Sequence, residues 1–242
     1  MKVEDPEFLR ALANAKSRFE LWSQMLKAAR VQTMLEVGVW KGEYAQYILE
    51  RCDSIQRYYM IDPWATLPDW NKPYNVAPKA FDEVYQEAMK RTDFAASKRI
   101  ILKGRTKEVI DEIDDGSLDF AYIDGDHTLR GITIDLIKVL PKIKEGGLIG
   151  GDDFTNTPWQ HGIQFEPTLV CPFTVYFAEA FDLPIAALPF EQFVIQKRSS
   201  SAFAFIDTTN SHNDISLNRL PLSLFKSALR RKVKQVFSPS RS

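Results

Sequence analysis

The order of apolar and helical segments most constrains what this chain can fold into. Five short apolar runs alternate with segments of helical periodicity, at residues 33–37, 58–61, 99–102, 118–123 and 148–151. Strands that alternate with helices form a parallel sheet with right-handed crossovers and helices on both faces. We therefore expect an α/β fold with a doubly wound, mostly parallel, seven-stranded Rossmann-like sheet. Residues 191–197 and 201–206 are predicted to be its terminal strand pair.

The pattern divides the chain into three parts. Residues 1–29 carry apolar residues at helical spacing and predict an N-terminal helical cap. Residues 30–207 hold the alternating pattern and predict one α/β domain. Residues 208–242 form a polar linker and a basic tail, amphipathic over 222–237. Such a tail suits an anionic membrane surface, the domain itself or a second subunit in a homodimer.

The charge and the cysteines exclude several classes of protein. Lys and Arg total 31 against 32 for Asp and Glu, a net charge of -1, so no general attraction to nucleic acid is expected. Cys52 and Cys171 are far apart in apolar surroundings, as reduced core thiols would be. No signal peptide or membrane span is readable. We expect a soluble, cytoplasmic protein without a thiolate metal site.

A glycine turn follows the first predicted strand. Gly38 and Gly42 lie on either side of three larger residues, Glu36 precedes them, and Asp62 ends the next strand. Such a turn lets a ligand approach the backbone and the helix N-terminus closely, and a strand-terminal acid can bind both hydroxyls of a ribose. Glu36 would repel a pyrophosphate but suits a cationic ligand. The alternative is a purely structural turn between strand and helix.

Three acidic residues come directly after neighbouring predicted strands. Asp124 follows the fourth apolar run, and Asp152 and Asp153 follow the fifth. The carboxyl ends of parallel strands share one sheet edge, where ligands bind, so these carboxylates should converge. Converging like charges need a counter-charge, and oxygen ligands suit Mg²⁺, Mn²⁺ or Ca²⁺. We expect the three aspartates to hold a divalent ion, Mg²⁺ or Mn²⁺.

His127 lies three positions after Asp124, at the start of the next predicted helix. An imidazole with a pKa of about 6.5 can take a proton from a hydroxyl at neutral pH. We therefore assign catalysis to His127 and Asp124. They act either beside a metal or as a metal-free acid-base pair, with Asp152 and Asp153 lining the pocket. The structural alternative is that His127 caps the helix or bonds Asp126.

Together these motifs resemble the class I S-adenosylmethionine-dependent methyltransferases. The resemblance covers about residues 30–206 and is carried by the Glu-x-Gly-x-x-x-Gly turn, Asp62, Asp124-Gly125-Asp126-His127 and Gly146-Gly147-Leu148-Ile149. The Ile-Asp-Gly-Asp-His stretch is similar to the small sugar and natural-product O-methyltransferases. The resemblance implies that Glu36 and Gly38 lie near the amino-acid part of the cofactor, with Gly42 in the same turn. It also implies that Asp62 holds the ribose and that Asp124, besides its other roles, lies against the cofactor.

The resemblance implies roles for further residues. Gly104, Arg105 and Thr106 would border the adenine. Trp64 would cover the adenosine, or pack as a lid or core aromatic. The metal-dependent catechol-type O-methyltransferases hold magnesium with an aspartate after strand four and an Asp-Asn pair after strand five. They carry a basic residue where this chain has His127. Asp153 replaces the asparagine here, which adds negative charge.

Aromatic, amide and hydroxyl side chains crowd two predicted loops near the strand ends. They are Trp70 and Tyr74 in one loop, and Thr155, Asn156, Trp159, Gln160 and His161 in the other. Such groups suit a sugar or another polyhydroxylated acceptor, or simply lie on surface loops. We therefore predict methyl transfer from S-adenosylmethionine to a hydroxyl of a sugar, glycan, glycolipid or small natural product.

Two other classes of function stay open. One is an NAD-dependent oxidoreductase, against which count the missing third glycine and the absence of a well-placed Tyr-x-x-x-Lys pair. The other is a non-catalytic partner protein that keeps the cofactor fold and docks through its basic tail. Binding of S-adenosylmethionine rather than NAD would distinguish a methyltransferase from the oxidoreductase. Methyl transfer to an acceptor would distinguish it from the non-catalytic partner protein.

Overall fold

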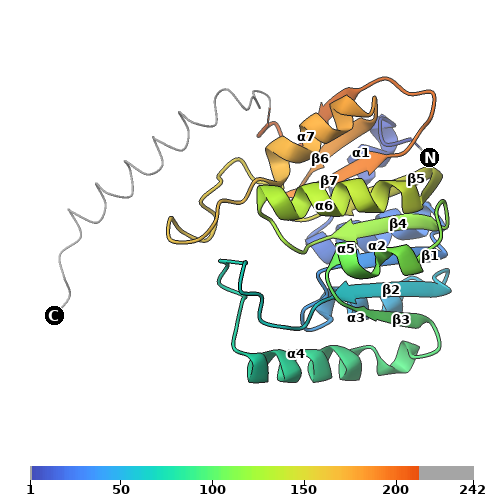
Figure 1. The fold of residues 1–242 in the computed structure, drawn as a ribbon. Helices are drawn as coiled ribbons and strands as arrows, with labels where there is room; N and C mark the ends of the chain where they lie inside the picture. Colours follow the sequence, from blue (N-terminus) through green and yellow to red (C-terminus); the bar gives the residue numbers. More distant parts are fainter. Residues whose placement is uncertain (1, 213–242) are drawn as a thin grey trace.

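A single eight-stranded sheet organises the chain, in the order β3-β2-β1-β4-β5-β7-β6-β8 (Figure 1). The computed structural model describes residues 2–212, so the basic tail predicted at 222–237 lies outside the described residues. Its strands are β1 (Thr33–Val37), β2 (Arg57–Asp62), β3 (Arg99–Lys103), β4 (Leu118–Ile123), β5 (Ile143–Gly151), β6 (Pro184–Leu188), β7 (Gln192–Gln196) and β8 (Ala204–Asp207). The predicted α/β class is confirmed.

Helices cover both faces of this sheet. They are α1 (Pro6–Leu12), α2 (Arg18–Ala28), α3 (Glu43–Arg51), α4 (Pro78–Arg91), α5 (Thr106–Val109), α6 (Leu129–Val139) and α7 (Val170–Ala180). Short 3-10 turns occupy Asp93–Ala95, Ile110–Glu112 and Leu140–Lys142. In Figure 1, α5, α6 and α7 lie on the near face and α1, α2 and α3 on the far face. Each face buries its own apolar cluster. Among the described residues, no helix is long and apolar enough to cross a membrane.

The parallel register brings the polar strand ends together. Val37 pairs with Ile61 of β2 and with Ile123 of β4, and Ile123 pairs with Gly151 of β5. The residues that follow these positions therefore emerge at one edge. β1, β2 and β4 are largely buried because both faces of the sheet are covered, which explains their nearly continuous apolar runs.

The last strands differ from the expected terminal pair. β7 pairs antiparallel with both β5 and β6, and β8 pairs parallel with β6. The strand missing from the sequence prediction is β6, a fully buried Pro-Ile-Ala-Ala-Leu run directly after α7. A short apolar run of this kind shows no alternation that would mark it as a strand. It raises the count from the predicted seven strands to eight.

The N-terminal helices pack directly on the sheet. Ser17 accepts a hydrogen bond from the Glu20 N–H and caps α2. Trp22 of α2 is fully buried and contacts the rings of Phe120 and Tyr122. A Cβ on Gly150 of β5 would lie 2.0 Å from the Trp22 ring, so glycine is required for this close approach. The N-terminal helices are thus part of the core, and their packing brings the start of α2 to the carboxyl edge of the sheet.

Two loops extend past the strand ends, at residues 63–77 and 152–169 (Figure 1). They are tied to each other. The Asn71 N–H donates to Glu166 Oε2 at 3.2 Å, and the Glu166 N–H donates to the Asn71 carbonyl at 3.2 Å. Lys72 Nζ donates to the Glu166 carbonyl at 2.9 Å. The two loops therefore form one continuous wall beside the carboxyl edge.

Candidate active site

A cavity of about 540 Å³ opens at the carboxyl ends of the strands. The strand order reverses at β1, because β2 lies on one side of it and β4 on the other. The cavity lies at this point, which is where open α/β sheets bind ligands. Seven of the nine residues predicted to bind the cofactor line it: Glu36, Gly38, Asp62, Gly104, Arg105, Thr106 and Asp124. Gly42 and Trp64 do not.

The turn after β1 depends on two glycines with positive φ. Gly38 has a φ of 87°, and a Cβ there would lie 2.0 Å from the Asp124 carbonyl oxygen. Gly42 has a φ of 74°, and its Cβ would lie 3.1 Å from Ala88 Cα of α4. Gly38 therefore lets the turn pass the end of β4, whereas Gly42 lets α3 start close to α4. Only the first of these contacts is at the cavity.

Asp62 organises the same turn. Its Oδ2 accepts hydrogen bonds from the Val39 and Trp40 N–H groups at 3.0 and 2.9 Å, and its Oδ1 accepts from the Trp64 N–H at 2.7 Å. Burial raises the pKa of Asp62 to about 6, although these N–H groups oppose the rise. A carboxylate has about four acceptor positions, so one is left for a ribose hydroxyl.

The aromatic residue at the turn that lines the cavity is Trp40, one of the three larger residues between the two glycines. Its ring contacts Tyr74 and Phe81 at centroid distances of 5.6 and 5.9 Å. Trp64 is buried, packs on Tyr85 and donates its Nε1–H to the Trp40 carbonyl at 2.9 Å. Trp64 therefore occupies the core position that was its structural alternative.

Glu36 is buried within a group of tyrosines. Its Oε2 is 2.8 Å from the Tyr58 hydroxyl, and burial raises its pKa well above the ordinary value. Beside Glu36, the rings of Tyr44 and Tyr122 stack on each other, with 4.0 Å between the two ring centroids. Glu36 also lines the cavity, so an acidic group meets any ligand that enters past the Gly38 turn.

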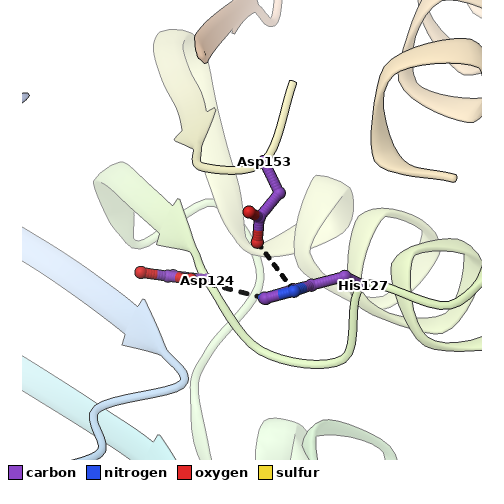
Figure 2. A group of neighbouring side chains, drawn as sticks. All are labelled: Asp124, His127 and Asp153. Atoms are coloured by element: carbon purple, nitrogen blue, oxygen red, sulfur yellow. Dashed lines mark ion pairs between the residues drawn. The ribbon is translucent and has the colours of Figure 1, made fainter. Parts of the chain in front are cut away.

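The acidic cluster centres on His127 (Figure 2). His127 Nδ1 lies 2.7 Å from Asp153 Oδ2, and His127 Nε2 lies 3.4 Å from Asp124 Oδ1. One ligand atom from each of the three residues can lie within 4.8 Å of the others. Asp153 has a φ of 59°, a left-handed conformation that aspartate tolerates better than most residues. The structure thus brings together Asp124, His127 and Asp153.

The charges around His127 change its protonation. Burial would lower its pKa, but Asp153 and Asp124 outweigh burial and raise the pKa to about 10. Burial would likewise raise the pKa of Asp153, but His127 and Gln160 lower it to about 2. His127 Nε2 is buried and poorly aligned for a hydrogen bond to Asp124. The imidazole therefore holds its proton in this arrangement, unlike the free histidine assumed from the sequence.

Asp152 faces a different partner, Arg18, the first residue of α2. Arg18 Nη1 forms an ion pair with Asp152 Oδ2 and lies 3.3 Å from Asp124 Oδ2. Gln192 of β7 donates to Asp152 Oδ1. Both oxygens of Asp152 are therefore engaged by side chains of this chain. No local motif marks Arg18 or Gln192, because each is far in sequence from Asp152.

The remaining predicted residues divide between the cavity and its surroundings. Trp70, Tyr74, Gln160 and His161 line the cavity, together with Asp126. Thr155 and Asn156 line a separate hollow beside His212. Trp159 lines neither.

Asp126 bonds the distant Trp70, and Asp135 lines the cavity, neither of which the sequence revealed. Asp126 Oδ1 accepts from the Trp70 Nε1–H and from the Thr128 N–H, both at 3.0 Å, so it helps to begin α6 and holds the loop. Asp135 of α6 was not predicted. It lines the cavity, and burial raises its pKa to about 7, although a hydrogen bond with Thr106 opposes the rise.

Comparison with known proteins agrees with this geometry. Residues 35–154 match a family described as a methyltransferase domain. The match begins within β1 and ends just beyond Asp153, so it contains the glycine turn and the acidic cluster. No curated protein matches the sequence.

Solved structures share the fold at low identity. An O-methyltransferase from Bacillus cereus in complex with SAH is 13% identical, with a TM-score of 0.54 over 78% of this chain and 88% of that one. A SAH-bound methyltransferase from Podospora anserina is 12% identical, with a TM-score of 0.56 over 81% and 83%. An O-methyltransferase from Streptomyces achromogenes involved in tomaymycin synthesis, in complex with SAM, is 14% identical, with a TM-score of 0.52 over 83% and 93%.

Proposed function

We propose that this chain, a class I S-adenosylmethionine-dependent methyltransferase, transfers the cofactor methyl group to a hydroxyl of a sugar, glycan, glycolipid or small natural product. One observation carries the proposal: the cavity that begins at the Gly38 turn continues without interruption to the cluster of Asp124, His127 and Asp153. A methyl donor and a hydroxyl activated at that cluster would therefore share one cavity. The methyltransferase match sets aside the NAD-dependent alternative.

The cavity walls suit the two substrates in different regions. Glu36, Gly38 and Asp62 would hold the amino-acid and ribose parts of the cofactor, and residues 104–106 would border its adenine. Beyond the acidic cluster, Trp70, Tyr74, Gln160 and His161 offer aromatic faces and polar groups to an acceptor that carries hydroxyls. Two of the solved structures with this fold are described as O-methyltransferases, which supports oxygen as the atom that is methylated.

The donor set fits a divalent ion, but with one change from the expected ligands. Asp124, His127 and Asp153 supply two carboxylates and an imidazole within reach of one another, and the buried His127 Nε2 has no hydrogen-bond partner among residues 2–212. We propose these three as ligands; to bind the ion, His127 would have to release one of the two ring protons that it holds between the aspartates. Asp152 is replaced by His127 in this set because its oxygens bind Arg18 and Gln192. An imidazole among carboxylates favours Mn²⁺ over Mg²⁺, which prefers oxygen ligands. When bound, the ion would lower the pKa of the acceptor hydroxyl.

A metal-free version of the same reaction is the second candidate. It is favoured by Arg18, which already supplies a positive charge to Asp124 and Asp152, and by the pairing of His127 with Asp153. In this version Asp124 and His127 act as the acid-base pair: the Asp124 carboxylate would take the hydroxyl proton, and the protonated His127 beside it would stabilise the negative charge. The cavity, the cofactor and the product stay the same.

Chelation separates the two versions. The purified chain is incubated with S-adenosylmethionine and a panel of sugars and catechols, and S-adenosylhomocysteine release is measured. Excess chelator should stop turnover, and Mn²⁺ should restore it more fully than Mg²⁺. Full activity in the chelator would contradict the metal version and support the acid-base pair.

A further inference from the structure

We propose that Arg18 binds the carboxylate of the cofactor's methionine moiety, and that a buried network centred on Gln192 holds Arg18 in place. The proposal rests on S-adenosylmethionine as the cofactor. It does not depend on the acceptor or on a metal. It assigns a binding role to the N-terminal helical cap, in which the sequence marks no site residue.

Arg18 is placed at the cavity by the way α2 is anchored. Trp22 follows it by one helical turn, is fully buried and lies against Gly150 of β5. The Ser17 cap fixes where the helix begins. Arg18 is therefore held at the carboxyl edge of the sheet, where it lines the cavity. The exposed fraction of its side chain is 37%.

Gln192 fixes the partner of Arg18. Its Oε1 accepts from the Trp22 Nε1–H at 2.6 Å and from the Tyr122 hydroxyl at 3.0 Å. Its Nε2 donates to Asp152 Oδ1 and to the Phe190 carbonyl. An indole N–H can only donate, so the amide oxygen must face Trp22 and the NH₂ group must face Asp152. This fully satisfied, buried amide orients Asp152 so that its other oxygen meets Arg18.

Arg18 retains donors for a ligand. A guanidinium carries five N–H donors, and the ion pairs of Arg18 with Asp124 and Asp152 both use Nη1. Three other cationic side chains along the cavity have different partners: Lys41 pairs with Glu87, and Arg105 and Arg130 pair with Asp69. Arg18 is the arginine of this group that reaches the acidic end of the cavity.

The methionine end of the cofactor fits this position. By resemblance it lies near Gly38, where an added Cβ would lie 2.0 Å from the Asp124 carbonyl oxygen, and the Asp124 side chain contacts Arg18. Glu36 lines the same part of the cavity. An amino acid carries an ammonium and a carboxylate. A Glu36 carboxyl oxygen would accept a hydrogen bond from the ammonium, and the guanidinium of Arg18 would complement the charge of the carboxylate. Arginine binds carboxylates through two parallel hydrogen bonds, which a lysine cannot reproduce.

The test removes the carboxylate from the ligand and the guanidinium from the protein. Calorimetry measures the binding of S-adenosylmethionine and of decarboxylated S-adenosylmethionine to the wild type and to Arg18→Gln. The wild type should bind the complete cofactor at least about tenfold more tightly, as expected for hydrogen bonds between charged groups. Arg18→Gln should lose this preference through weaker binding of the complete cofactor, with the decarboxylated form bound as before.

Three further variants complete the test. Lys27→Gln makes the same charge change at an exposed site on α2 and should leave both affinities unaltered. Arg18→Lys should keep only part of the preference. Gln192→Glu places a carboxyl group against Asp152 and should reduce the preference; an unchanged preference would remove Gln192 from the proposal.

Two outcomes with Arg18→Gln would overturn the assignment of Arg18. Equal weakening of both ligands would mean that Arg18 only supports the fold, and unchanged binding of S-adenosylmethionine would mean that it does not touch the cofactor. Failure of the wild type to bind either ligand would instead contradict the use of S-adenosylmethionine, which is a different result.

Discussion

Asp153 Oδ2 lies 2.7 Å from Nδ1 of His127, across the gap between the ends of β5 and β4. Gln160 donates to the other oxygen of Asp153, and the left-handed backbone at Asp153 directs its side chain toward the histidine. The two residues come from segments that meet only because β4 and β5 are neighbours. Their contact defines the part of the cavity where we place the chemistry.

The proposed ligand set predicts opposite results for adjacent aspartates. Asp153→Ala and His127→Ala should each abolish measurable Mn²⁺ binding, because each removes one of three ligands. Asp152→Ala should retain Mn²⁺ binding, because Asp152 bonds Arg18 and Gln192 instead. Electron paramagnetic resonance of Mn²⁺ titrated with protein measures this directly. Loss of binding in Asp152→Ala with retention in His127→Ala would restore the ligand set expected from the sequence.

Gly38→Ala should prevent the turn after β1 from forming. The new Cβ would lie 2.0 Å from a backbone oxygen at a φ of 87°, so neither rotation nor a side-chain shift relieves it. We expect the loss of cofactor binding and a fall in the free energy of unfolding of at least about 3 kcal/mol, measured in urea. Gly116→Ala is the matched control. It has a φ of 62°, but no atom of the part of the chain that the structure describes lies within 4 Å of its Cβ, so it should cost only about 1 kcal/mol.

Cofactor affinity should fall as the pH drops through about 6. Asp62, with a pKa of about 6, accepts hydrogen bonds from the turn and from a ribose hydroxyl more strongly as an ionised carboxylate than as a neutral acid. Calorimetry of S-adenosylmethionine binding from pH 8 to pH 5 measures the effect. Asp62→Asn should bind weakly at every pH in this range. An affinity independent of pH in the wild type would exclude Asp62 as an ionised ribose ligand.

The same raised pKa of Asp62 predicts that acid stabilises the fold, whereas it weakens cofactor binding. The folded pKa of Asp62 lies above its ordinary value of 3.8, so the folded state binds a proton more readily than the unfolded state does. Its contribution to stability is therefore complete below about pH 3.8 and is lost as the pH rises through about 6. The acid-induced loss of cofactor affinity should thus occur without destabilisation from Asp62. Urea unfolding without cofactor, compared between the wild type and Asp62→Asn, measures this contribution.

Gln192→Leu should destabilise the fold by about 2–4 kcal/mol. The change leaves the buried Trp22 N–H and Tyr122 hydroxyl without their shared acceptor, and each unsatisfied buried group costs about 1–3 kcal/mol. Urea unfolding measures the loss. Gln24→Leu, at an exposed position of α2, should change stability by less than about 0.5 kcal/mol. Equal effects in the two variants would show that the amide network contributes little.

The sequence could predict those site residues that follow directly from strand order. Asp62, Asp124 and Asp153 come just after strands of an alternating pattern, and parallel strands place such residues at one edge. Arg18 and Gln192 could not be predicted in the same way, because they reach Asp152 only through the packing of α2 and β7 on β5. β6 escaped prediction because a short, wholly buried run has no alternation.

The fate of the two tryptophans near the turn shows a further limit. Both flank the site in sequence, but which of them faces the cavity depends on the three-dimensional course of the turn. Trp64 bonds the Trp40 carbonyl and turns into the core, which leaves the ring of Trp40 on the cavity wall. The charge on His127 could not be predicted from the sequence either, because it depends on two carboxylates that come close to the imidazole only in the folded chain.

Methyl transfer from S-adenosylmethionine labelled with ¹³C in its methyl group tests the central claim most directly. The purified chain is supplied with Mn²⁺ and a panel of sugars, catechols and amines, and the products are read by NMR, which distinguishes methyl groups on oxygen, nitrogen and carbon. We predict a methoxyl signal on a hydroxyl-bearing acceptor, and its loss in Asp153→Ala. A label found only on nitrogen or carbon, or a methoxyl signal of full strength in Asp153→Ala, would contradict the account.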